Sequence, residues 1–119
     1  MALQTFRTSD GSRVKHKISV AGDFSTHPGP RYIKQGNWSG EKFRKLLEAR
    51  LDRHEFIEVD LDGTRGYGSS FLDEAFGGLI RSTKLTKSEF NRRISIKSEE
   101  DPTYRDEALE AVQQAVVHS

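Results

Sequence analysis

The chain of 119 residues contains no cysteine. This absence excludes disulfides, thiolate nucleophiles, iron–sulfur clusters and cysteine-based zinc sites, and it gives no sign of secretion. No segment approaches the roughly 20 consecutive apolar residues that a membrane helix needs. The first residues also lack the long apolar run that follows the basic start of a secretory signal. We therefore expect a cytoplasmic protein with no membrane span.

The chain also lacks an excess of charge of either sign. Nineteen lysines and arginines stand against eighteen aspartates and glutamates, which gives a formal net charge of +1. No overall field attracts nucleic acid or anionic lipid, so neither is an expected partner. The length, with 34% hydrophobic residues, fits one soluble domain over residues 1–119, in which residues 1–13 could form a flexible N-terminal arm.

Alternation of apolar and polar residues predicts three half-buried strands, at residues 14–21, 56–61 and 92–97. A fourth strand is expected at residues 31–34 as the returning arm of a hairpin. A structureless segment as long as residues 22–39 would be unusual in a compact domain.

Apolar residues at helical spacing predict the helices. One begins near Gly40 behind Ser39 as its N-cap and runs to about Arg53. The most apolar helix covers residues 71–80, and a short helical turn follows Thr86. A closing helix begins at Asp101 and Pro102, which suit an N-cap and the first helical position.

The three main strands alternate instead of being apolar throughout, which indicates that helices cover only one face of the sheet. The fold class is therefore α/β. We expect the opposite face to carry a mixed-charge set of side chains: Lys17, Ser19, Glu58, Asp60, Arg93, Ser95 and Lys97.

Three blocks of sequence, at residues 18–24, 66–78 and 97–102, together with Asp60-Leu61-Asp62-Gly63, resemble the STAS superfamily of sulfate transporters and anti-sigma-factor antagonists. The resemblance is closest to a bacterial STAS-like branch of unknown function. It implies a four- to five-stranded mixed sheet with helices packed mainly on one face, and a regulatory protein-interaction module. Gly68 and Phe71 depart from the family pattern, which usually has an aspartate and a glycine there.

In antagonists of that superfamily, a histidine-kinase-like ATPase is the partner and phosphorylates a serine in the loop at the start of the helix after the central strand. By position the resemblance assigns this role to Ser69, with Ser70 as its neighbour. The resemblance implies that the chain is a phosphoprotein that binds such an ATPase. A homo-oligomer is left open.

The residue pattern by itself predicts that residues 66–70 join the end of a strand to the start of a helix. Backbone N–H groups and the helix dipole favour an anion at such a place. The same residues also describe an ordinary turn with an N-cap. Ser70 and Asp73 resemble a capping box, which would leave Ser69 as the freer hydroxyl. The candidate partner- or anion-binding residues are Gly66, Tyr67, Gly68, Phe71, Asp73, Glu74, Arg31, Tyr32 and Trp38.

Tyr32 and Trp38 are aromatic side chains beside Arg31, the types that dominate binding hot spots, although they could equally fasten the loop to the sheet edge. The sequence shows no paired nucleophile and base, no metal-ligand spacing and no cofactor motif, so no catalytic residue, metal or cofactor is expected. The alternative to a partner-binding module is a small-ligand or nucleotide sensor that uses the same helix start together with Arg31.

Overall fold

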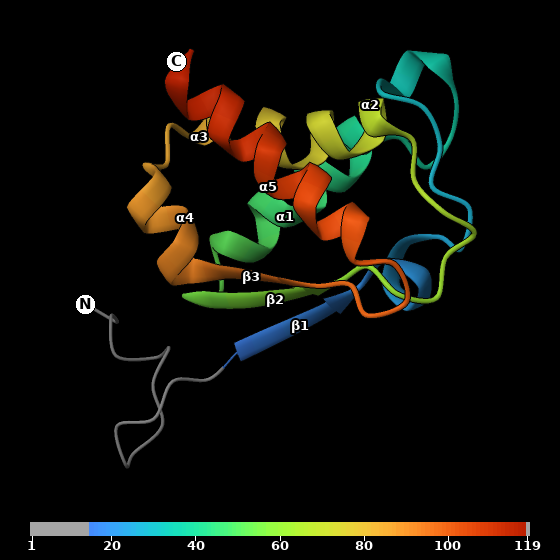
Figure 1. Ribbon diagram of the computed structural model, residues 1–119, viewed down its shortest axis with the longest axis horizontal. Coiled ribbons are helices and arrows are strands. Elements are labelled where there is room, and N and C mark those ends of the chain that lie inside the picture. The colour runs from blue at the N-terminus through green and yellow to red at the C-terminus, as the bar shows by residue number, and fades with distance from the viewer. Residues whose placement is uncertain (1–14, 119) are drawn as a thin grey trace.

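The computed structural model describes residues 15–118, so the expected arm at residues 1–13 and the first residue of the first expected strand lie outside the described residues. A parallel sheet lies at the base of the molecule, and the larger helices stand above one of its faces (Figure 1). Its strands, in the order β1-β2-β3, are β1 (Lys15–Ser19), β2 (Phe56–Asp60) and β3 (Ile94–Lys97).

The strands follow one another in the same direction across the sheet, so two right-handed crossovers place their helices on the same face. Ile18, Val59 and Ile96 are neighbours in register and point into the core beneath these helices. The remaining elements are η2 (Val20–Phe24), η3 (Ile33–Gln35), α1 (Gly40–Leu51), α2 (Ser69–Leu72), η4 (Asp73–Gly77), α3 (Gly78–Thr83), α4 (Lys87–Arg93) and α5 (Pro102–Val117).

The number and direction of the strands differ from the expectation of four or five in a mixed sheet. Within residues 15–118 there are three strands, all parallel. The hairpin strand predicted at residues 31–34 is wrong, because this segment runs into the short helical turn η3. Its carbonyl groups bind α1 instead of a strand: the Pro30 and Arg31 oxygens accept hydrogen bonds from the backbone N–H groups of Gly40 and Glu41, at 2.8 and 2.9 Å.

The alternation of the strands is confirmed, but one residue of the predicted open face is misplaced. Lys17, Glu58 and Ser95 lie side by side on the face away from the helices. Arg93, in contrast, ends α4. Its guanidinium reaches back to the chain that leaves α1, where it donates to the carbonyl oxygens of Leu51 and His54, each at 3.0 Å, and of Glu55 at 2.9 Å. Arg93 therefore satisfies carbonyl groups that the end of a helix leaves without partners.

The predicted helix boundaries hold where a capping side chain marks them. Ser39 accepts the N–H of Lys42 at 3.0 Å, and Thr86 forms a reciprocal capping box with Glu89. Asp101 caps α5, with Pro102 at the first helical position. α1 ends at Leu51, two residues before the predicted end.

The apolar helix predicted over residues 71–80 is longer and is interrupted. It begins at Ser69 and ends at Thr83, and its middle turn, η4, is a π-helix. A π-turn of this kind contains one residue more than an α-helical turn and is often found at functional sites.

A pair of stacked histidines joins β1 to the loop after α1. The imidazole rings of His16 and His54 are parallel, with their centroids 3.9 Å apart. Burial, the His54 ring and the charge of Arg50 together lower the pKa of His16 below its usual 6.5, and Asp23 partly opposes them. The folded protein thus binds a proton here less readily than the unfolded chain does.

We expect Arg93→Met to lower the free energy of unfolding by about 2 kcal/mol or more, because three carbonyl groups lose a charged donor. Arg92→Met is the matched control. Arg92 lies next to Arg93 but is exposed and forms an ion pair with Glu55 at 3.1 Å, and an exposed ion pair contributes about 1 kcal/mol or less. Urea denaturation of both variants measures the difference, and equal losses would contradict this role of Arg93.

The His16 site should also make stability depend on pH. The contribution of neutral His16 to the free energy of unfolding is complete above pH 6.5. It is lost as the pH falls below that value, because the lowered pKa makes protonation of His16 costly only in the folded state. Between about pH 7 and about pH 5, stability should therefore fall more steeply in the wild type than in His16→Gln. Urea denaturation across this range tests the prediction, with His118→Gln at the end of α5 as the control. Parallel profiles for the wild type and His16→Gln would refute it.

Candidate functional site

The loop that follows β2 is fastened to the loop that follows β3. The Asp62 carboxylate accepts the backbone N–H groups of Glu99 and Glu100 at 3.1 and 2.9 Å, and Glu100 in turn accepts the N–H of Gly63 at 2.8 Å. Asp62 is therefore a structural residue that joins two loops at the carboxyl ends of neighbouring strands. Gly66 ends this segment with a φ of +124°, a conformation that suits glycine.

Tyr67 anchors the start of the helix. Its hydroxyl donates to the Leu61 carbonyl oxygen at 2.7 Å, and its ring contacts Tyr104 edge-on with centroids 5.0 Å apart. Burial raises the pKa of the Tyr67 phenol above its usual range, so the group stays a neutral donor. Tyr67 therefore positions the loop, and most of its ring is unavailable to a partner.

The two candidate serines differ in exposure. Gly68 is the N-cap of α2 and supplies no capping side chain, so the predicted capping box of Ser70 with Asp73 is wrong. Ser69 is the first helical residue and is exposed, whereas Ser70 is half-buried. Within residues 15–118 neither hydroxyl has a hydrogen-bond partner, and Ser69 is the one that a large reagent can reach.

The helix behind Ser69 belongs to the core and offers little contact surface. Phe71 and Phe76 are fully buried. Gly40 at the start of α1 lies so close that an added Cβ would be 2.5 Å from the Phe71 carbonyl oxygen. Phe71, predicted as a partner-binding residue, therefore packs inside the protein, because the apolar positions of this helix face α1, α5 and the sheet.

Two acidic residues of the first turns are held by arginines from three different elements. Asp73 Oδ2 lies 2.5 Å from Nη1 of Arg31, and Glu74 Oε2 lies 3.2 Å from Nε of Arg44 in α1. Arg81 of α3 contacts both carboxylates, at 3.5 and 3.6 Å. Glu74 is only 8% exposed, and a carboxylate so buried requires such partners. We call these five side chains the arginine–carboxylate cluster.

The cluster changes the interpretation of Arg31. Its hydrogen bond to Asp73 raises the pKa of Arg31 above the usual value, and the guanidinium is engaged with protein carboxylates. Arg31, Asp73 and Glu74, all predicted as binding residues, are thus brought together, but as partners of one another. An anion at this helix start would have to displace Asp73 from Arg31.

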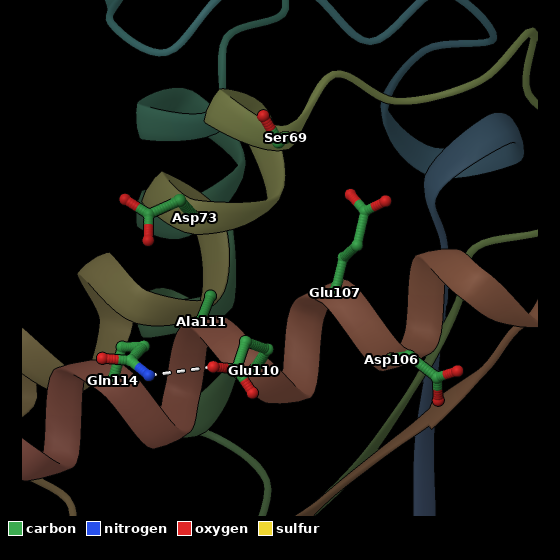
Figure 2. Close-up of a pocket in the computed structure, with 7 residues that line it drawn as sticks. All are labelled: Ser69, Asp73, Asp106, Glu107, Glu110, Ala111 and Gln114. Carbon is green, nitrogen blue, oxygen red and sulfur yellow. Dashed lines mark hydrogen bonds between the residues drawn. The ribbon is translucent and has the colours of Figure 1, made fainter.

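A groove of about 480 Å³ lies between α2 and η4 on one side and α5 on the other. In Figure 2, Ser69 stands at its upper edge and Glu107 points from α5 into the space between the helices. Glu110 also lines it and is hydrogen-bonded to the Gln114 amide at 2.8 Å. We call this surface the acidic groove; its lining residues are Ser69, Asp73, Asp106, Glu107, Glu110, Ala111 and Gln114.

Tyr32 and Trp38 lie in a loop beside the arginine–carboxylate cluster. Trp38 has a φ of +59°, which is unusual for a bulky residue. One side of the Trp38 ring contacts Phe24 edge-on with centroids 5.4 Å apart, and the Nζ of Lys42 lies 4.2 Å from its centre. Trp38 is still 40% exposed and Tyr32 is 41% exposed. The loop is thus partly fastened to the core and partly presented to solvent.

The sequence pattern did not reveal several residues of this region. Arg44 and Arg81 occupy ordinary polar positions of helices, and no local signal connects them with Glu74. Nor did the pattern reveal the acidic groove, because the carboxylates of α5 lie more than thirty residues from Ser69 in the chain. A charge-periodicity analysis of α5 would at least have found its exposed acidic side.

Two classes of site have no support in residues 15–118. No three histidine or acidic side chains converge as metal ligands would. The helices of the described part are all too short or too polar to cross a bilayer.

A family model described as a STAS-like domain of unknown function matches residues 39–104. The match begins at the N-cap of α1, contains β2, β3 and the Ser69 region, and ends in the first turn of α5. The resemblance inferred from the sequence is thereby confirmed, while β1 and most of the loop that carries Tyr32 and Trp38 precede the matched range. Neither a curated protein nor a solved structure matches the chain.

The close approach of α1 to the helix start predicts a contrast between two glycines. Gly40→Ala should lower the free energy of unfolding by about 2 kcal/mol, because its new methyl group collides with backbone atoms of Phe71. At Gly68, by contrast, an added Cβ meets no atom within 4 Å. Gly68→Ser should leave stability unchanged or raise it by about 0.5 kcal/mol, since serine is a good N-cap. Thermal unfolding monitored by circular dichroism compares the two, and equal stability would contradict the packing described.

Proposed function

Because the chain belongs to the family of STAS-like domains of unknown function, we propose that it is a non-enzymatic regulatory module that binds a histidine-kinase-like ATPase. Ser69 is the residue that the ATPase phosphorylates, and the phosphate controls whether the two proteins associate. The observation that carries this proposal is the position of Ser69, an exposed hydroxyl at the first turn of a helix that is otherwise part of the core.

The accessibility of Ser69 supports its choice over Ser70. A kinase must bring the serine hydroxyl within bonding distance of a nucleotide phosphate, and this requires an exposed side chain. Ser69 is exposed and makes no hydrogen bond within the described residues, whereas Ser70 is half-buried. Gly68 before Ser69 leaves free space around the acceptor, since no atom would lie within 4 Å of a Cβ added there.

The surroundings of Ser69 explain how a phosphate would act. It adds roughly −1.5 to −2 charges at neutral pH. Asp73 follows Ser69 by one helical turn, and the acidic groove carries Glu107 and Glu110 as further carboxylates. Repulsion among these groups disfavours contact with any acidic partner surface, while the Arg31–Asp73 pair is the contact that the phosphate can rearrange.

The partner surface combines the first turn of α2 with the neighbouring loop. Tyr32 and Trp38 supply exposed aromatic area, which is enriched among residues that dominate binding energy. Arg31 connects the loop to Asp73, so a change at Ser69 acts next to the aromatic residues. The buried helix face, including Phe71, takes no direct part.

Incubation of the protein with a histidine-kinase-like ATPase and Mg–ATP tests the proposal. Intact-mass measurement should show a gain of about 80 Da in the wild type and in Ser70→Ala, and none in Ser69→Ala, because only the exposed hydroxyl is modified. Size-exclusion chromatography of the mixture follows the complex. Ser70→Ala is the matched control, and a chain that gains no phosphate and forms no complex would refute the proposed function.

A further inference from the structure

The loop before α1 carries most of the exposed large hydrophobic side chains of the described residues. Among residues 15–118 the large hydrophobic side chains classed as exposed are Tyr32, Ile33, Trp38 and Val117, and the first three belong to this loop. Ile33 is 46% exposed. Exposed apolar residues that lie together are typical of protein–protein contact surfaces.

Two lysines lie at the edge of this apolar surface, beside Glu41, whose carboxylate accepts the Ile33 N–H at 2.8 Å and lies 3.8 Å from Lys45. Lys34 follows Ile33, is exposed, and forms no ion pair with another described residue. Lys42 lies over the Trp38 ring without a carboxylate partner in the described part. The backbone of the loop is held in place by hydrogen bonds to α1, so its shape exists before any partner arrives. We call the set of Tyr32, Ile33, Lys34, Trp38 and Lys42 the loop patch.

The acidic groove has the opposite character. Asp106 and Glu107 form no ion pair within residues 15–118, and Glu110 has only the neutral Gln114 amide as its partner. Ala111 supplies an apolar floor between them. Asp73 at the other side of the hollow is paired with Arg31 and Arg81. The three carboxylates of α5 have no such cation within the described residues, so they leave a negative potential that complements lysine side chains on an apolar surface.

The loop patch and the acidic groove adjoin one another on the same molecule. Arg31 directly precedes the loop patch and lies 2.5 Å from Asp73, which itself lines the groove. A two-fold dimer needs a self-complementary surface, in which one region of each copy contacts a different region of the other. Two adjacent regions of opposite charge fulfil this requirement. One two-fold rotation of a second copy brings its loop patch onto the acidic groove of the first, and its acidic groove onto the loop patch of the first.

We propose that the protein forms a two-fold homodimer in which the loop patch of each copy occupies the acidic groove of the other. Lys34 faces the carboxylates of Glu107 and Glu110 across the interface, and Ile33 and Tyr32 cover the apolar floor at Ala111. The net charge of +1 produces little repulsion between two copies. The dimer is a property of the unmodified chain and does not depend on an ATPase or on Ser69 phosphorylation.

Sedimentation equilibrium of the full chain tests the dimer, with protein from about 10 µM to about 1 mM. We expect the wild type to dimerise and the dissociation constant to rise as NaCl increases from about 50 to about 500 mM, because salt screens contacts at the rim. Lys34→Glu and Glu110→Lys should each weaken the dimer by about tenfold or more.

The double variant Lys34→Glu/Glu110→Lys restores opposite charges and should return the dissociation constant to within about threefold of the wild type. Lys84→Glu is the matched control: Lys84 is an exposed lysine at the end of α3, outside both surfaces, and its reversal should leave the dimer intact. Circular dichroism confirms that each variant is folded. A wild type that stays monomeric, single reversals without effect, or a double variant as weak as the singles would each overturn the proposal.

Discussion

The ion pairs around Glu74 are the interaction on which the arrangement of this protein depends. A carboxylate that is 8% exposed is costly unless charged donors surround it. Here the donors come from α1 and α3, and Arg31 brings the preceding loop to the neighbouring Asp73. The cluster therefore fixes three segments around the first turns of one helix, and removing any one arginine would leave a buried charge with fewer partners.

This cluster explains why the surface around Ser69 combines such different features. The core side of the helix is apolar and closely packed, down to the contact between Gly40 and Phe71. The solvent side carries an exposed serine, the acidic groove and an aromatic loop. The arginines hold the loop beside the acidic groove. A partner that binds the loop is therefore close to the groove, and a partner that binds the groove is close to the loop. The proposed partner binding and the proposed dimer use overlapping surfaces, so the two would exclude one another.

The parts of the fold that the sequence predicted correctly are those with a local cause. Alternation in the strands placed Ile18, Val59 and Ile96 in the core, and Ser39, Thr86 and Asp101 marked the helix starts. The strand expected at residues 31–34 failed because the backbone partners of this segment lie in α1, which no local pattern reveals. Arg93 was misplaced for a similar reason, since its position suited a strand but the carbonyl groups at the end of α1 bind its side chain. In the site, Ser69 is the exposed serine, although the Ser70 capping box from which this was expected does not form, and its role stays a prediction. The pairing of Arg31 with Asp73 required the folded chain.

The π-turn η4 affects how the helix from Ser69 to Thr83 should be compared with those of relatives. It contributes one residue beyond the α-helical repeat, and each residue of an α-helix turns the chain by about 100°. In a relative without the extra residue of the π-turn, α2 would keep its direction. There α3 would be rotated by about 100° about its own axis. Arg81 would then leave the carboxylates that it now contacts. An alignment of such a relative with this chain would thus be offset by one residue after Gly77 compared with the alignment before it.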